Sequence, residues 1–216
     1  MTDIFKDPEK HRRKKILFHY GVEALQKQGW TVEREKGLGK SSVRRITKSG
    51  DSKLVSIRTT QDRWIAFPPN PDGKGWVTLD SVEAVIAVSL APKTSSEAWV
   101  HWLPAKEMRE RFDVAYNARK KAGRVFPKRR GVWIPLYQRE SDNPKNVGFV
   151  GGGAGLDHLP MAKVPLNGVG PAHLLTEPDD LRGGDDGGHL TIPDAKRRLA
   201  RSLGVLESSI KIIVEA

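Results

Sequence analysis

The spacing of apolar residues predicts two helices in the first two thirds of the chain. Apolar side chains between Ile16 and Leu25 recur every three or four residues, which indicates an amphipathic helix that ends near Gly29. Residues 105–121 show the same spacing and precede Gly123, so they predict a second helix with a clear end. One face of this second helix carries Met108, Phe112, Ala115, Tyr116 and Arg119.

Short apolar runs bounded by glycine, proline and polar residues predict strands around these helices. We expect strands at residues 30–35, 42–47, 54–59, 63–67, 82–88, 98–103 and 131–136. The polar turn 48–51 joins two of them into a hairpin, whereas the proline-rich segment 68–75 can only be a loop. The run 82–88 fits a buried strand, with a helix as the alternative. This order predicts an α/β or α+β domain with a central mixed sheet flanked by helices.

The last third of the chain has a different composition. Residues 138–189 carry little periodicity and much glycine, proline and acid, and the glycine run 151–155 lacks the flanking strand and helix of a dinucleotide-binding fingerprint. We therefore expect a basic main domain at residues 1–137 and a flexible linker at 138–189. The order strand, helix, strand over residues 190–216 predicts a small β-α-β unit, which is too short to fold alone. It should dock on the main domain or mediate a homo-oligomer.

The composition is that of a basic globular protein. The 216 residues include 37 Lys and Arg against 26 Asp and Glu, a formal net charge of +11, and no Cys. Mean hydropathy is −0.50 and no apolar run approaches the roughly 20 residues of a membrane span, so we expect no membrane partner. The first residues lead into charge rather than into an apolar stretch. Together with the lack of cysteine, this favours the cytoplasm over secretion.

The positive charge is concentrated in residues 1–150, which hold 30 Lys and Arg and 17 Asp and Glu. Such a field attracts polyanions, chiefly DNA or RNA through their phosphates. We expect the basic run 10–15 to form a charged arm before the first helix.

Two dense basic clusters are the candidate phosphate-binding residues. The first follows the predicted hairpin and third strand and consists of Lys40, Arg44, Arg45, Lys48, Lys53, Arg58 and Arg63. The second follows the long helix and consists of Arg119, Lys120, Lys121, Arg124, Lys128, Arg129 and Arg130. Four aromatic residues near them could stack on unpaired bases, although most aromatics at such positions belong to a core: Trp64, Trp76, Phe126 and Trp133. A solvated basic surface without a partner is the alternative.

The order of elements over roughly residues 12–121 resembles the core of the restriction-endonuclease-like, or PD-(D/E)xK, nucleases. That family usually shows an acidic residue, a spacer and a lysine on its third strand, where this chain has Ser56-Ile57-Arg58. The second strand, which carries the family's aspartate, here offers Ser42-Val43-Arg44. Glu23 on the first helix is the one position that matches a family acid.

The resemblance implies a nuclease-like domain without nuclease activity. Magnesium-dependent hydrolysis needs at least two converging carboxylates and a group that orients the water, and serine and arginine supply neither. We therefore expect a protein that binds nucleic acid, most of all DNA, through phosphate contacts. We expect it to catalyse no reaction and to need no metal or other cofactor. Two alternatives stay open. One is an active magnesium-dependent nuclease that uses Glu23 with Asp51 or Asp62, and the other is a protein-interaction or dimerisation module whose basic surface is incidental.

Overall fold

The computed structural model describes residues 7–35, 42–126, 130–140, 146–166 and 209–211. The chain divides into two units, Met1–Gly183 and Gly184–Ala216, and the following account concerns the first. The predicted β-α-β unit at 190–216 therefore lies outside the described residues, apart from 209–211. Within the described ranges, no helix is long and apolar enough to cross a membrane.

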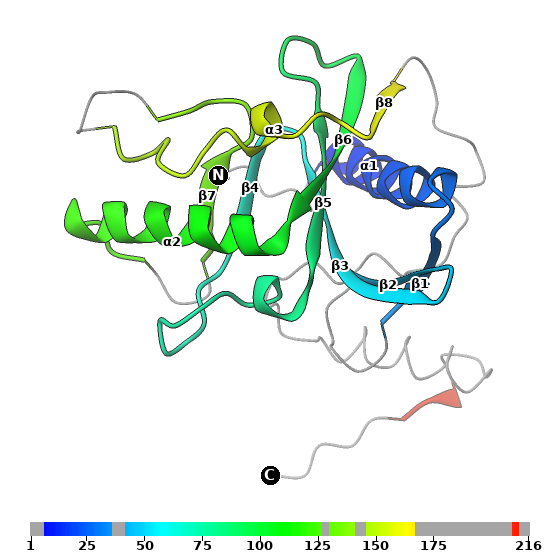
Figure 1. The fold of residues 1–216 in the computed structure, drawn as a ribbon, viewed down its shortest axis with the longest axis horizontal. Helices are drawn as coiled ribbons and strands as arrows, with labels where there is room; N and C mark the ends of the chain where they lie inside the picture. The colour runs from blue at the N-terminus through cyan, green and yellow to red at the C-terminus, as the bar shows by residue number, and fades with distance from the viewer. Residues whose placement is uncertain (1–6, 36–41, 127–129, 141–145, 167–208, 212–216) are drawn as a thin grey trace. The chain divides into compact units, whose positions relative to one another are not determined.

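A six-stranded mixed sheet forms the centre of the first unit (Figure 1). Its strands, in spatial order, are β1 (Thr31–Arg34), β2 (Val43–Lys48), β3 (Asp51–Thr60), β5 (Ala84–Leu90), β6 (Glu97–Pro104) and β8 (Ala162–Pro165). Strands β3 and β5 run parallel, and the other neighbours are antiparallel. The predicted mixed α/β class is confirmed, and the run 82–88 is a strand rather than a helix.

Helix α1 (Pro8–Lys27) covers one face of this sheet, where Leu17 and Leu25 are fully buried. Gly21 allows the close approach of helix and sheet. A Cβ atom at this position would lie 2.9 Å from both Ile57 Cγ2 on β3 and Val88 Cγ2 on β5, which is too close for any side chain. The helix therefore packs directly on the two parallel strands at the centre of the sheet.

The start of α1 differs from the prediction. The Asp7 carboxylate accepts hydrogen bonds from the backbone N–H groups of Glu9 and Lys10, and Pro8 occupies the first turn, where its missing N–H does no harm. The helix consequently begins at Pro8, and the basic run 10–15 is part of it rather than an arm before it.

Helix α2 (Ala105–Lys121) packs on the other face of the sheet and has the bounds that its apolar spacing predicts. The segment between β3 and β5 lies on the same side and includes β4 (Trp64–Phe67) and the short 3-10 helix η2 (Leu79–Ser81). Strand β4 pairs with β7 (Val132–Pro135) in a separate small sheet. Phe112 of α2 is central to this core, because its ring lies 5.2 Å from both the Phe67 and the Trp76 ring.

Part of the predicted linker belongs to the fold. Residues 146–166 contain α3 (Ala154–Asp157) and β8, and β8 extends the sheet by pairing with β6. The glycine run 151–155 is packed rather than flexible: a Cβ atom at Gly151 would lie 2.2 Å from the Arg111 carbonyl oxygen. These glycines allow two backbone segments to approach closely. Two other parts of the predicted linker, 141–145 and 167–189, lie outside the described residues.

Candidate nucleic-acid interface

The structure brings together Ser42 and Ser56, the two serines that the predicted family resemblance aligns with acidic positions. Ser42 precedes β2 and Ser56 lies on β3, and their Oγ atoms are 3.4 Å apart. Arg58 shares a strand face with Ser56, and its guanidinium packs 4.4 Å from the centre of the Phe67 ring. Two hydroxyls and a guanidinium provide no anionic ligand, so this position lacks the charge that binds a divalent cation.

The three carboxylates of the active-nuclease alternative lie apart. Glu23 is on α1, across the sheet from the serine pair, and forms an ion pair with Lys27 at 2.6 Å. Asp51 begins β3 and pairs with Lys53, whereas Asp62 follows the end of the same ten-residue strand. The described part of the chain therefore does not assemble the site of that alternative. No group of three or more His, Asp or Glu side chains suited to a metal ion occurs there either.

The first basic cluster is largely engaged in contacts within the fold. Arg44 is only 8% exposed, and its guanidinium stacks on the Phe18 ring of α1 at 4.8 Å. Arg45 makes two hydrogen bonds to the Glu35 carboxylate, at 2.9 and 3.0 Å. Arg63 donates to two backbone carbonyl groups in the segment after β5, at 2.8 and 3.3 Å. Phosphate contact by Arg44 would require its side chain to leave the α1 interface, and it stays a prediction.

The two described lysines of the first cluster lie beside one indole ring. Lys48 and Lys53 place their Nζ atoms 5.9 and 5.3 Å from the centre of the Trp30 ring. Lys48 also donates to the Gln28 carbonyl oxygen at 2.6 Å, which ties β2 to the end of α1. Lys40 lies outside the described residues. This cluster thus consists mainly of cations with partners in the chain itself, and it does not form one open basic face.

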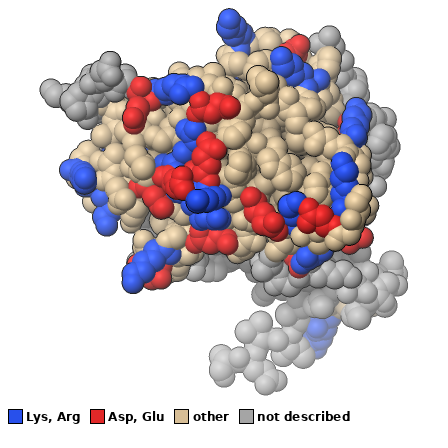
Figure 2. Space-filling view, in the orientation of Figure 1, with Lys and Arg blue, Asp and Glu red and all other residues tan. Residues whose placement is uncertain are grey.

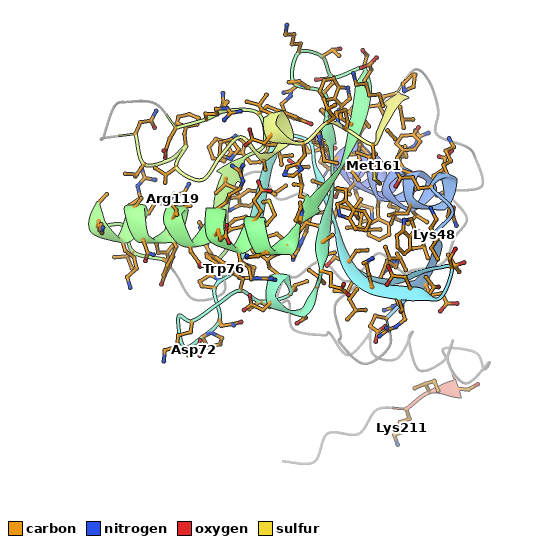
Figure 3. All side chains as sticks on the ribbon, in the orientation of Figure 1. Lys48, Asp72, Trp76, Arg119, Met161 and Lys211 are labelled. Atoms are coloured by element: carbon orange, nitrogen blue, oxygen red, sulfur yellow. The ribbon has the colours of Figure 1, made fainter. Side chains whose placement is uncertain are left out.

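The second basic cluster contains one buried arginine. Arg119 is 5% exposed, and its Nη2 donates to the carbonyl oxygens of Trp133 at 2.6 Å and Gly148 at 2.7 Å (Figure 3). Burial lowers the pKa of this guanidinium below its ordinary value, and the nearby charge of Arg124 adds to the effect. Arg119 therefore holds α2 to β7 and to the loop after it. Phosphate contact by its guanidinium would require these hydrogen bonds to break, and it stays a prediction.

The other described cations of the second cluster are exposed: Lys120, Lys121, Arg124 and Arg130. We call these four residues the helix-end cluster. None of them forms an ion pair with an acidic residue in the ranges that the structure describes. Lys128 and Arg129 lie between them in the sequence and outside those ranges. Figure 2 shows basic and acidic side chains interleaved across one face of the molecule.

Trp133 is the exposed aromatic residue beside the helix-end cluster. Its side chain is 40% exposed, because it points away from the core while its strand neighbours Val132 and Ile134 point inward. Trp76 is buried in the core, and its Nε1 donates to an Asp113 carboxylate oxygen at 2.9 Å. The remaining two expected stacking residues are partly covered by other rings: Trp64 by Phe149 at 5.7 Å and Phe126 by Tyr116 at 4.8 Å.

A buried polar network, which the sequence patterns did not reveal, joins the segment after β7 to the sheet. The Tyr137 hydroxyl lies 2.6 Å from Ser89 Oγ and 2.9 Å from His101 Nε2. His101 Nδ1 lies 2.9 Å from the His158 carbonyl oxygen, which can only accept. The proton is therefore on Nδ1, so Nε2 accepts from Tyr137 and Tyr137 accepts from Ser89. Burial lowers the pKa of His101 and raises the pKa of Tyr137 to about 12, which keeps both groups neutral.

A charged network continues from His158 toward the surface. Its Nε2 lies 2.6 Å from Glu107 Oε2, and Arg111 Nε donates to the other oxygen of Glu107 at 2.7 Å. Arg111 and Arg139 both donate to Asp157, each at 2.5 Å. Burial acts to raise the pKa of Glu107, but the hydrogen bonds from Arg111 and His158 outweigh it and hold this pKa below its ordinary value. These contacts fasten α3 to α2.

We expect the free energy of unfolding to decrease as the pH falls from about 7 to about 5. Burial holds the pKa of His101 below that of the unfolded chain, about 6.5, so unfolding takes up a proton between the two values. This contribution is fully present above the unfolded pKa and is lost below it. Chemical denaturation across this range, with the His101→Gln variant alongside, measures it, because the carboxylates titrate mostly at lower pH. Equal pH slopes for the variant and the parent protein would contradict the assignment.

Comparison of the chain with protein-family models, with curated proteins and with solved structures gave no significant match.

Proposed function

We propose that this chain binds nucleic acid through the helix-end cluster and does not cleave it. The observation that carries the proposal is the set of four exposed cations, three at the end of α2 and just after it and one before β7, that have no ion-pair partner in the described chain. Such cations release counterions when they neutralise phosphates, and they lose no existing ion pair in doing so. The exposed indole of Trp133 on the neighbouring strand adds a surface that suits a base. DNA is the first class of ligand to test.

The proposal that the chain does not cleave nucleic acid rests on Ser42 and Ser56, the serine pair. If the chain has a restriction-endonuclease-like core, as the order of α1, β1, β2 and β3 suggests, the metal carboxylates would belong near Ser42 and Ser56. Their hydroxyls, with Arg58 beside them, cannot hold magnesium and activate a water. A nuclease-like domain that has kept its binding surface and lost its chemistry accounts for both features.

The binding proposal is tested by exchanging matched sets of cations. In one variant, Lys121, Arg124 and Arg130 are replaced by glutamine, and in the control Arg45, Lys48 and Lys53 are replaced in the same way. Both variants lose three positive charges, but the control cations already have partners within the chain.

Fluorescence anisotropy with labelled DNA should show a loss of affinity of about tenfold or more for the first variant and about threefold or less for the control. Equal losses would mean that net charge, and not this site, determines binding. Absence of binding by the parent protein would refute the proposal.

Incubation with magnesium or manganese should leave plasmid and single-stranded DNA intact at protein concentrations that bind them. The reason is the lack of converging carboxylates around the serine pair in the described chain. Gel electrophoresis over several hours measures the outcome. Cleavage that disappears in the Asp51→Asn or Asp62→Asn variant would restore the active-nuclease alternative.

A further inference from the structure

We infer that the outward face of the small β4–β7 sheet stacks on unpaired bases, so that the protein prefers single-stranded nucleic acid to duplex. This inference rests on the proposed function and names the form of its ligand. It begins with the alternation of side chains in the two strands. Ile65 and Phe67 of β4 and Val132 and Ile134 of β7 are buried in the core shared with α2. The residues between them therefore lie on the opposite face.

Two tryptophans occupy that outward face. Trp64 pairs with Pro135 and Ala66 pairs with Trp133, so Trp64 and Trp133 are diagonal neighbours on the same face. Diagonal neighbours in an antiparallel pair are about 7–8 Å apart, within the reach of aromatic side chains. Phe149 partly covers the Trp64 ring at 5.7 Å, and Pro135 opposite Trp64 is buried, so Trp133 is the accessible aromatic residue of this face.

The immediate neighbours of Trp133 leave its indole accessible. Ala66 lies directly opposite it, and Gly131 lies two residues before it, on the same side of the strand. A Cβ atom at Gly131 would lie 2.8 Å from Ala66 Cβ, so there is no room for a side chain at residue 131. The surface at these two positions therefore consists of backbone and the Ala66 methyl group. No long side chain covers the ring from these two positions, in accord with its 40% exposure. A flat aromatic ring on an open strand face is the feature on which bases stack in single-strand-binding domains.

Charge beside this aromatic face selects a polyanion as its occupant. Arg119 holds the last turn of α2 to the Trp133 carbonyl group at 2.6 Å, so Lys120 and Lys121 lie in the turn next to the strand. Arg130 precedes the strand directly. A single strand stacked on Trp133 would place its phosphates nearest Arg130 and would reach the lysines at the end of α2 only around the edge of β7, because α2 packs on the opposite face of this sheet from the indole. In a duplex the bases are already stacked and paired, so only the phosphate contacts remain.

The test compares the two forms of nucleic acid at the same salt concentration. Oligonucleotides of about 12 nucleotides, as DNA and as RNA, are titrated single-stranded and as duplexes against the parent protein, Trp133→Ala and Trp133→Phe. We expect Trp133→Ala to weaken single-strand binding about tenfold and to change duplex binding by about twofold or less, with Trp133→Phe retaining part of the affinity. We also expect single strands to quench tryptophan emission less in Trp133→Phe than in the parent protein.

The outcomes separate this inference from the proposed function. If neither single strands nor duplexes bind, the proposed function fails. If both bind and the helix-end cluster variant weakens both, but Trp133→Ala weakens neither or weakens both equally, the stacking inference alone is overturned. A selective loss on single strands of either DNA or RNA supports it.

Discussion

Replacing Gly151 by alanine is expected to lower the free energy of unfolding by about 2 kcal/mol or more, which lowers Tm by several degrees in a chain of this length. Its backbone has a φ of +78°, which is strained for any residue with a side chain. The added Cβ atom would also lie 2.2 Å from the Arg111 carbonyl oxygen, and neither the helix backbone nor the loop can yield cheaply. Both effects act on the folded state.

The control for this prediction is Gly148→Ala in the same segment. A Cβ atom there would meet nothing nearer than Asn146 Oδ1 at 3.7 Å, so we expect a change within about 0.5 kcal/mol. Thermal and chemical denaturation of the two variants measure the difference. If Gly151→Ala were as stable as Gly148→Ala, the segment would be the flexible linker that its composition suggests, and the packing described above would be incorrect.

Replacing Arg119 by alanine is expected to cost about 2–4 kcal/mol of stability, far more than any other cation of the second cluster. The substitution leaves the carbonyl oxygens of Trp133 and Gly148 without their donor and opens a space between α2 and β7. Lys121→Ala is the matched control, because this exposed side chain has no ion-pair partner in the described chain, and its loss should change stability by about 0.5 kcal/mol or less.

The effects of these two substitutions on nucleic-acid affinity should be in the opposite order to their effects on stability. We expect Arg119→Ala, measured where it is still folded, to bind nearly as well as the parent protein, and Lys121→Ala to bind more weakly. Denaturation and anisotropy on the same two proteins provide both readouts. A stable Arg119→Ala protein with lost affinity would return Arg119 to the binding surface.

Helices and strands that pack their apolar side chains into the core were predictable from the sequence. The apolar residues of α2 recur on one face because that face packs on the β4–β7 sheet, and Gly123, with a φ of +75°, follows its end. Strand β5 is buried at all seven positions, which accounts for the apolar run Ala84–Val88 seen in the sequence. In both cases the burial that stabilises the element also determines its residue pattern.

Elements held by backbone contacts were not predictable in this way. The glycine run 151–155 packs through main-chain atoms, and contacts of that kind leave no pattern of apolar side chains. Strand β8 is a short edge strand with half-buried and exposed positions, so its alternation is weak. Likewise, nothing in the sequence indicates that Ser89, His101 and Tyr137 meet, because they come from three separate segments.

The candidate site was predictable in composition but not in detail. A run of basic residues does not show which cations have partners, since those partners are distant in sequence, as Glu35 is from Arg45. One signal was present for Arg119. It falls four residues after Ala115 and seven after Phe112, on the apolar face of α2, and this spacing indicates burial. Exposure of Trp133, in contrast, depends on the pairing of β7 with β4, which local sequence does not specify.

The salt dependence of affinity tests the central claim most directly. For the parent protein and the Lys121→Gln, Arg124→Gln, Arg130→Gln variant, the logarithm of the binding constant is plotted against the logarithm of salt concentration with the same single strand and the same duplex. Each phosphate contact contributes about 0.7 to the slope for single strands and about 0.9 for duplex DNA. We expect a steep slope for the parent protein and a slope smaller by about two in the variant. A flat response of the parent protein, or equal slopes for the two proteins, would show that the helix-end cluster does not bind phosphate.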